Sequence, residues 1–82
     1  MFHRIQRVNV MPHLILRIDF VEGITKLYDV HSLIQKLPVF RILSQDEALF
    51  SSVYVDVGGY GIVWNDELDL SCDELWDNGV PA

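Results

Sequence analysis

Six carboxylates gathered near the C-terminus are the residues best suited to chemistry: Asp66, Glu67, Asp69, Asp73, Glu74 and Asp77. Such a group can bind a divalent cation, perform acid–base hydrolysis or contact a basic protein. A calcium loop needs oxygen ligands at alternate positions and a central glycine, whereas leucines take alternate positions here and glycine is absent. No feature fixes two carboxylates across a cleft for hydrolysis. We therefore expect a protein-contact surface, with a solvated surface and a cation site as alternatives.

Cys72 and the histidines are the other candidates for chemistry. Cys72 stands where a helix is expected to begin, which lowers a thiol pKa, but Asp73 and Glu74 oppose the thiolate. We expect a small buried hydrophobe. The histidines lack the paired spacing of a zinc site: His3, His13 and His31. The sequence thus predicts no catalytic residue, metal or cofactor, and a protein that is not an enzyme.

The tract Gly58-Gly59-Tyr60-Gly61 is rich in glycine but lies between two expected strands. A phosphate-binding loop needs a helix N-terminus behind it and, in the Walker form, a lysine. The tract therefore predicts a hairpin turn, since glycine adopts positive φ readily. We expect Trp64 and Trp76 in the core and Tyr60 as an exposed ring.

The charges divide unevenly along the chain, whose net charge is −6. Residues 1–45 carry six basic and three acidic residues, whereas residues 46–82 carry nine acidic residues and neither Lys nor Arg. This balance opposes nucleic-acid binding and favours an acidic face for a basic partner, or a face that serves solubility. The single cysteine and the lack of a signal-peptide or membrane-spanning run predict a cytoplasmic location.

Alternating apolar residues predict strands over residues 5–10, 14–20 and 24–28 in an antiparallel meander, with Leu14, Leu16, Ile18 and Phe20 on one face. Asp29 is placed to cap a helix over 30–36, which Pro38 ends. Residues 39–43 are either a turn or an extended piece. Ser44 and Glu47 match a capping box, which predicts a helix from Gln45 to about Ser51.

The second half predicts another meander and a final helix. Val53, Val55 and Val57 alternate as the buried face of a strand, and residues 62–64 and 68–70 pair after it. Ser71 and Glu74 form a second capping box, and Gly79 ends that helix. The fold class is therefore α+β in one domain, residues 1–82: two antiparallel meanders of about six short strands, two short central helices and a capped C-terminal helix.

The order and spacing of these segments resemble the small bacterial family DUF2442. The resemblance rests on Phe20-x-x-Gly23, Asp29-Val30, Pro38-Val39-Phe40, Val53-Tyr54-Val55-Asp56, the tract from Gly59 to Trp64, Leu68-Asp69-Leu70-Ser71 and Leu75-Trp76. It implies an α+β domain without established catalytic residues, whose relatives are often proposed to partner a small adjacent toxin-like protein. Some relatives add a helix-turn-helix behind this domain, and we expect none in a chain that ends at Ala82.

The function predicted from these features is a non-enzymatic interaction module, antitoxin-like or regulatory, which masks a small basic protein. The expected contact residues are Tyr60, Asp66, Glu67, Asp69, Asp73, Glu74 and Asp77, with Trp76 as an alternative apolar anchor. One alternative is a structural domain that assembles as a homodimer through a sheet edge. Another is a small protein that binds a divalent cation or a ligand. Contact with nucleic acid or membrane is not expected.

Overall fold

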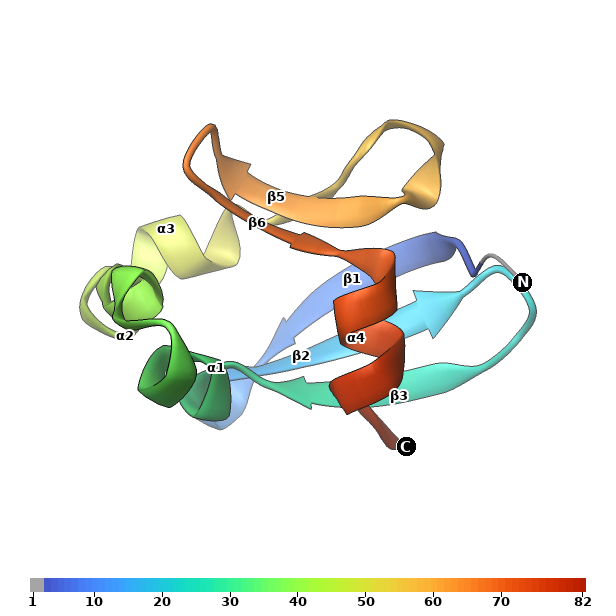
Figure 1. Ribbon diagram of the computed structural model, residues 1–82, viewed down its shortest axis with the longest axis horizontal. Coiled ribbons are helices and arrows are strands. Elements are labelled where there is room, and N and C mark those ends of the chain that lie inside the picture. Colours follow the sequence, from blue (N-terminus) through green and yellow to red (C-terminus); the bar gives the residue numbers. More distant parts are fainter. Residues whose placement is uncertain (1–2) are drawn as a thin grey trace.

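The computed structural model describes residues 3–82 (Figure 1). Within this range, seven strands form two antiparallel sheets, one of four strands ordered β1-β2-β3-β7 and one of three ordered β4-β5-β6. The strands are β1 Ile5–Met11, β2 Ile15–Phe20, β3 Thr25–Asp29, β4 Tyr54–Val55, β5 Gly61–Asn65, β6 Leu68–Ser71 and β7 Val80–Pro81. The helices are α1 Val30–Lys36, α2 Ile42–Gln45, α3 Glu47–Ser51 and α4 Cys72–Asn78.

The α+β class and the antiparallel meanders predicted from the sequence are confirmed. The two meanders remain separate sheets, and a short strand joins the first one. In this strand, β7, Val80 pairs with Leu27 and Pro81 pairs with Lys26. Strand β7 therefore forms the edge of the first sheet, next to β3. The sequence did not predict β7, because Gly79 and Pro81 are typical of a helix end and not of a strand.

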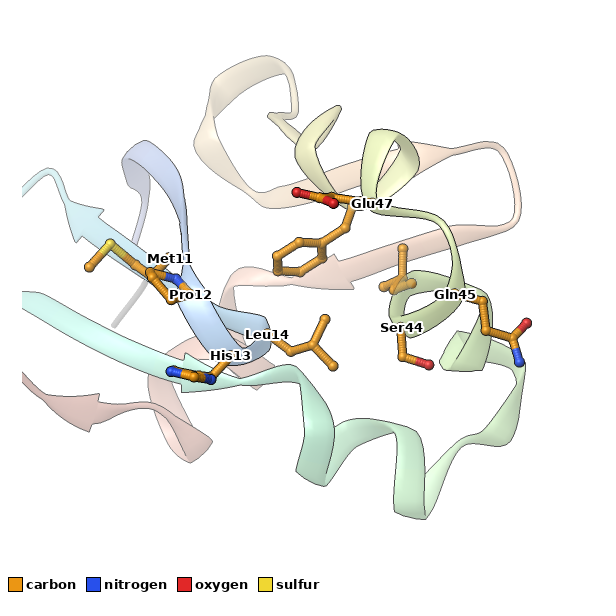
Figure 2. A pocket seen from close by; sticks show the side chains of 9 residues that line it. Met11, Pro12, His13, Leu14, Ser44, Gln45 and Glu47 are labelled. Atoms are coloured by element: carbon orange, nitrogen blue, oxygen red, sulfur yellow. The ribbon is translucent and has the colours of Figure 1, made fainter.

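The first sheet keeps the expected alternation along β2, where Leu16, Ile18 and Phe20 are buried. Leu14 is an exception, because it belongs to the 3₁₀ turn Pro12–Leu14 and the strand begins at Ile15. His13 and Leu14 both take left-handed backbone angles, with φ of 66° and 60°. Figure 2 shows Leu14 directed from this turn toward α2 and α3, and its side chain is partly buried against the core.

Of the three predicted helix caps, Asp29 and Ser71 are confirmed and Ser44 is wrong. The Asp29 carboxylate accepts the His31 amide at 2.9 Å, as predicted for the cap of α1. The Ser44 cap is wrong: Ser44 lies within α2, and its hydroxyl donates to the Arg41 carbonyl. Asp46 caps α3 instead, because its carboxylate accepts the Leu49 amide at 3.0 Å. A charged acceptor makes a stronger bond to a helix N-terminus than a hydroxyl.

The stretch between α1 and α2, which the sequence left as turn or extended, is the 3₁₀ turn Pro38–Arg41. It is a turn that buries one large side chain, that of Phe40. Phe40 meets the Trp64 ring edge-on, with 6.1 Å between centroids.

The β4–β5 hairpin turns at Gly58 and Gly59, whose φ values of 80° and 79° confirm the glycine hairpin. Only the first part of the expected valine strand forms. Val57 was expected on the buried face and is 91% exposed, because the chain leaves the sheet at Asp56 and continues as the 3₁₀ turn Val57–Gly59. The Asp56 carboxylate stabilises the start of this turn, because it accepts the Val57 amide at 2.8 Å.

Ser71 begins α4 as expected, with its hydroxyl accepting the Glu74 amide at 3.1 Å. Glu74 does not bond back to the cap, because its carboxylate accepts the Tyr28 hydroxyl at 2.8 Å. In Figure 1, α4 crosses the face of the first sheet, and α1, α2 and α3 gather at one end of the molecule.

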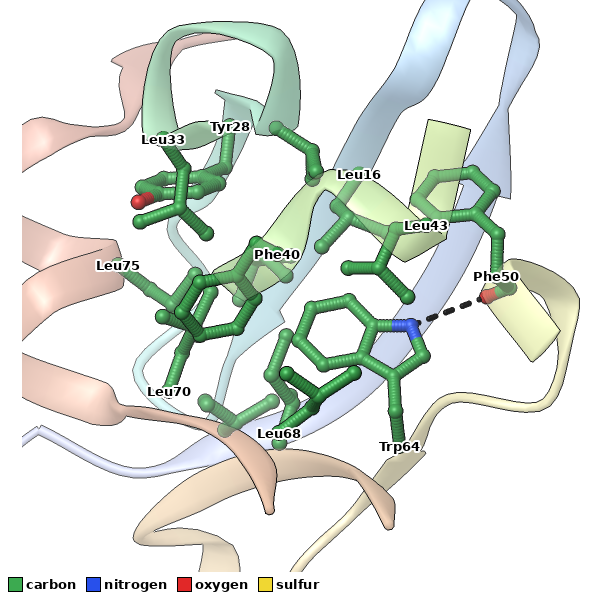
Figure 3. Packing of buried hydrophobic residues seen from close by; sticks show 14 of the residues in the cluster. Leu16, Tyr28, Leu33, Phe40, Leu43, Phe50, Trp64, Leu68, Leu70 and Leu75 are labelled. Atoms are coloured by element: carbon green, nitrogen blue, oxygen red, sulfur yellow. Dashed lines mark hydrogen bonds between the residues drawn. The ribbon is translucent and has the colours of Figure 1, made fainter. Parts of the chain in front are cut away.

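The core lies between the two sheets and the helices. Trp64 occupies its centre beside Leu43 and Leu68, and the indole nitrogen donates to the Phe50 carbonyl at 3.2 Å (Figure 3). Trp64 is therefore core, as predicted. Trp76 is half-buried and packs against the edge of the same core. The described residues contain no helix long and apolar enough to cross a membrane.

Candidate functional site

Six carboxylates of the second half, from Asp66 to Asp77, form a row along the chain over three consecutive elements. Asp66 and Glu67 form the turn between β5 and β6, where the Asn65 side chain accepts the Glu67 and Leu68 amides. Strand β6, whose four residues span roughly 13 Å, separates this turn from α4. The carboxylates therefore extend along the surface and do not converge on one point. Within residues 3–82, no group of three or more metal-ligating side chains is close enough to hold an ion.

Asp69 lies in the middle of this row, on the outward face of the small sheet. It pairs in register with Val63, and Val63 pairs with Tyr54 on the next strand. Their neighbours Ile62 and Leu70 are buried. Because side chains alternate along a strand, Tyr54, Val63 and Asp69 cross the same outer face. An aromatic ring and a carboxylate thus share one surface.

The helix α4 divides its acidic residues between two directions. Asp73 and Asp77 are both exposed and, four residues apart, lie on one side of the helix. Glu74 is half-buried and bonds to Tyr28, as described above. Asp73 and Asp77 follow β6 along the chain and remain exposed, whereas the Glu74 carboxylate lies toward β3.

Two exposed tyrosines accompany the carboxylates. Tyr60, which the sequence singled out, is 60% exposed. A Cβ at Gly58 would lie 2.6 Å from the Tyr60 ring, so glycine is what allows that ring to lie over the turn. Tyr54 is 55% exposed and was not among the predicted contact residues. Its place between Val53 and Val55, whose side chains pack on the core, is the signal that would have found it.

We call this region the acidic surface and define it by Tyr54, Tyr60, Asp66, Glu67, Asp69, Asp73 and Asp77. Unlike these two exposed tyrosines, Trp76, the alternative anchor, is half-buried against other side chains. Its ring stacks on His3 at 3.5 Å between centroids and meets Phe20 edge-on at 4.9 Å. The Lys26 ammonium lies 4.1 Å from the ring centroid. Trp76 therefore fastens α4 to the first sheet.

Cys72 is buried, and its thiol donates to the His3 carbonyl at 3.1 Å. Burial raises the pKa of this thiol, and the carboxylates of Asp73 and Glu22 raise it further. Since the thiolate is the reactive form, the folded protein presents an inert cysteine.

Two pockets open on the surface of the described residues. One, of about 420 Å³, lies between the β1–β2 turn and the segment from α2 to α3 (Figure 2). Its lining includes the apolar side chains of Leu14, Leu43 and Phe50 and the polar side chains of His13 and Glu47. The second, of about 310 Å³, lies between α1, β3 and α4.

Fold and surface together define a small α+β domain with an acidic, tyrosine-bearing face. A model of the family described as protein of unknown function (DUF2442) matches residues 5–81. The chain belongs to this family, which confirms the resemblance seen in the sequence. No curated protein and no solved structure matches the chain.

Proposed function

We propose that this protein is a non-enzymatic interaction module that binds a basic protein through the acidic surface. The observation that carries the proposal is the joint exposure of Tyr54 and Tyr60 on the half of the chain that holds nine carboxylates and neither Lys nor Arg. Protein interfaces are enriched in tyrosine at their energetic centres, and surrounding charge steers the partner.

The two kinds of residue have separate tasks in this proposal. The tyrosines supply apolar area at low entropic cost and serve as anchors. The row from Asp66 to Asp77 attracts a positively charged partner and opposes acidic proteins. By covering a basic surface of its partner, the module would mask that surface, which is how an antitoxin-like or regulatory protein acts.

The test is the affinity and the association rate for the protein encoded in the neighbouring reading frame, measured by surface plasmon resonance at two salt concentrations. We expect the triple variant Asp69→Lys, Asp73→Lys, Asp77→Lys to bind about tenfold more weakly or worse, mainly through slower association. Tyr60→Ala should cost about 1–2 kcal/mol of binding free energy or more. Glu47→Lys is the control variant, because this exposed carboxylate lies outside the acidic surface and lines the pocket between the β1–β2 turn and α2–α3. Absence of a complex, or equal loss in the control, contradicts the proposal.

A homo-oligomeric assembly domain is the second candidate. The observation in its favour is β1, a seven-residue strand at the edge of the four-stranded sheet. An edge strand with unpaired backbone groups can pair with a second copy. Light scattering at micromolar concentration decides this point, since a monomer would eliminate it.

A further inference from the structure

The second pocket is lined by no residue of the acidic surface and is built by three elements. Tyr28 and Asp29 come from β3, Leu33 and Lys36 from α1, and Glu74 from α4, with Ser32, Asn78 and Val80 completing the lining. Its volume of about 310 Å³ is sufficient for a long side chain or a small molecule. The question is which chemistry its polar groups would recognise.

Glu74 is held in place inside this pocket. The Tyr28 hydroxyl donates to the Oε2 atom of Glu74 at 2.8 Å, and the phenol ring is buried. Burial, together with the Glu74 carboxylate, raises the pKa of Tyr28, which keeps the hydroxyl protonated as a donor. This bond engages one carboxylate oxygen and leaves the lone pairs of Oε1 for another donor. The carboxylate is therefore oriented before any ligand arrives.

The remaining polar groups of the lining are mostly acceptors. The Asp29 carboxylate accepts the His31 amide and the Ser32 hydroxyl and still carries its negative charge. The Asn78 amide nitrogen donates to the Glu74 carbonyl, so its side-chain oxygen stays an acceptor. Two carboxylates face one cation, Lys36, and in the described residues neither carboxylate pairs with Lys36 within ion-pair distance.

We propose that this pocket receives the guanidinium group of an arginine side chain supplied by the basic partner, an inference that rests on the proposed function. Guanidinium carries five donors and no acceptor, which complements a lining dominated by acceptors. Its planar fork binds a carboxylate through two hydrogen bonds, and its weak hydration suits a partly enclosed site better than an ammonium does. Leu33 and Val80 contact the aliphatic stem.

The test needs no partner protein, because an arginine derivative can be titrated alone. The probe is Nα-acetyl-arginine amide, added up to about 100 mM because a single residue binds at millimolar strength at best. Chemical shifts of the Asn78 side-chain amide and the Leu33 methyl groups report occupancy. We expect saturable shifts centred on the pocket. The uncharged isostere Nα-acetyl-citrulline amide should give none, and the lysine analogue should bind more weakly.

Four variants locate the binding. Glu74→Gln keeps an acceptor for Tyr28 but removes the charge, and it should weaken binding at least about fivefold. Asp73→Asn removes the same charge from the adjacent position and should change binding less than about twofold, because that residue lies outside the pocket. Asn78→Arg places the protein's own guanidinium one turn beyond Glu74 and should abolish binding while preserving the fold. Lys36→Gln should tighten binding by removing the competing cation.

The outcomes separate this inference from the proposed function. Equal binding of citrulline, equal losses in Glu74→Gln and Asp73→Asn, or no shifts at the pocket would overturn the arginine site while leaving the acidic surface open to its own test. Conversely, a saturable arginine site in a protein whose neighbouring gene product does not bind would overturn the proposed function alone.

Discussion

Charged side chains are used differently in the two halves of the molecule. In residues 3–45 several of them are engaged within the fold: Arg17 lies 3.4 Å from Asp19, and Lys26 donates to the Trp76 carbonyl at the end of α4. On the acidic surface, Asp66, Asp69 and Asp77 are exposed, and the ion pairs of the described residues all lie in the first half. The first half thus uses several of its charges to hold the fold together, whereas these three carboxylates of the second half make no ion pair in the described residues.

The largest effect is expected where the two halves are joined. Trp76→Ala removes the stacking with His3, the edge contact with Phe20 and the cation–π contact with Lys26. We expect a loss of about 3 kcal/mol in the free energy of unfolding, measured by urea denaturation. A loss below about 1 kcal/mol would mean that α4 is held to the sheet by other contacts.

A pair of carboxylate deletions compares the halves directly. Asp29→Ala removes the cap of α1 and should cost about 1 kcal/mol of stability, because the His31 amide loses its acceptor. Asp69→Ala, on the outward face of β6, should stay within about 0.5 kcal/mol of the parent. Denaturation curves of the two variants measure both values. Equal losses would show that the distinction between the halves is wrong.

Reversing one charge of the second half should make the protein more stable. Asp77 lies in the last turn of α4, where the helix dipole disfavours a negative charge. Asp77→Lys is therefore expected to raise the free energy of unfolding by about 0.3–1 kcal/mol at low salt. High salt should reduce this gain, and a destabilised variant would reveal a contact that holds Asp77 in the fold.

The smallest effect concerns acid stability in the first half. The Thr25 hydroxyl donates to Asp19 at 2.7 Å, and this bond, with the Arg17 charge, lowers the pKa of Asp19. A lowered pKa in the folded state contributes stability above the unfolded value of about 4, and this contribution is lost as pH falls below it. Asp19→Asn should therefore flatten the loss of stability below about pH 4 in thermal melts. If the variant loses stability below about pH 4 as steeply as the parent, Asp19 does not have this role.

Local sequence signals predicted much of the fold because their causes lie within a few residues. Asp29 and Ser71 were recognised as caps since each bonds an amide two or three positions ahead. Gly58 and Gly59 were recognised from their tolerance of positive φ. Ser44 failed as a cap because Asp46, two residues later, is a stronger acceptor for the same helix start.

The candidate site was predicted in part. The row from Asp66 to Asp77 follows from composition alone, and the exposed ring of Tyr60 follows from its place in a turn. Alternation with Val53 and Val55 places Tyr54 on the exposed face, but Tyr54 was missed because aromatic residues near a valine strand were expected in the core. That Glu74 belongs to a pocket was not predictable, since its partner Tyr28 is 46 positions away.

The sequence by itself therefore determined the alternating strands, the glycine turn, the main helix caps and the separation of charge, because each depends on neighbouring residues. Only the tertiary structure decided that the meanders form two sheets, that β7 closes the first and that Trp76 joins α4 to His3 and Lys26. The tertiary structure also determined that the Glu74 carboxylate bonds to Tyr28, whereas Asp73 and Asp77 stay exposed. The physical reason is that contacts between distant residues depend on how whole elements pack, which no short stretch of sequence encodes.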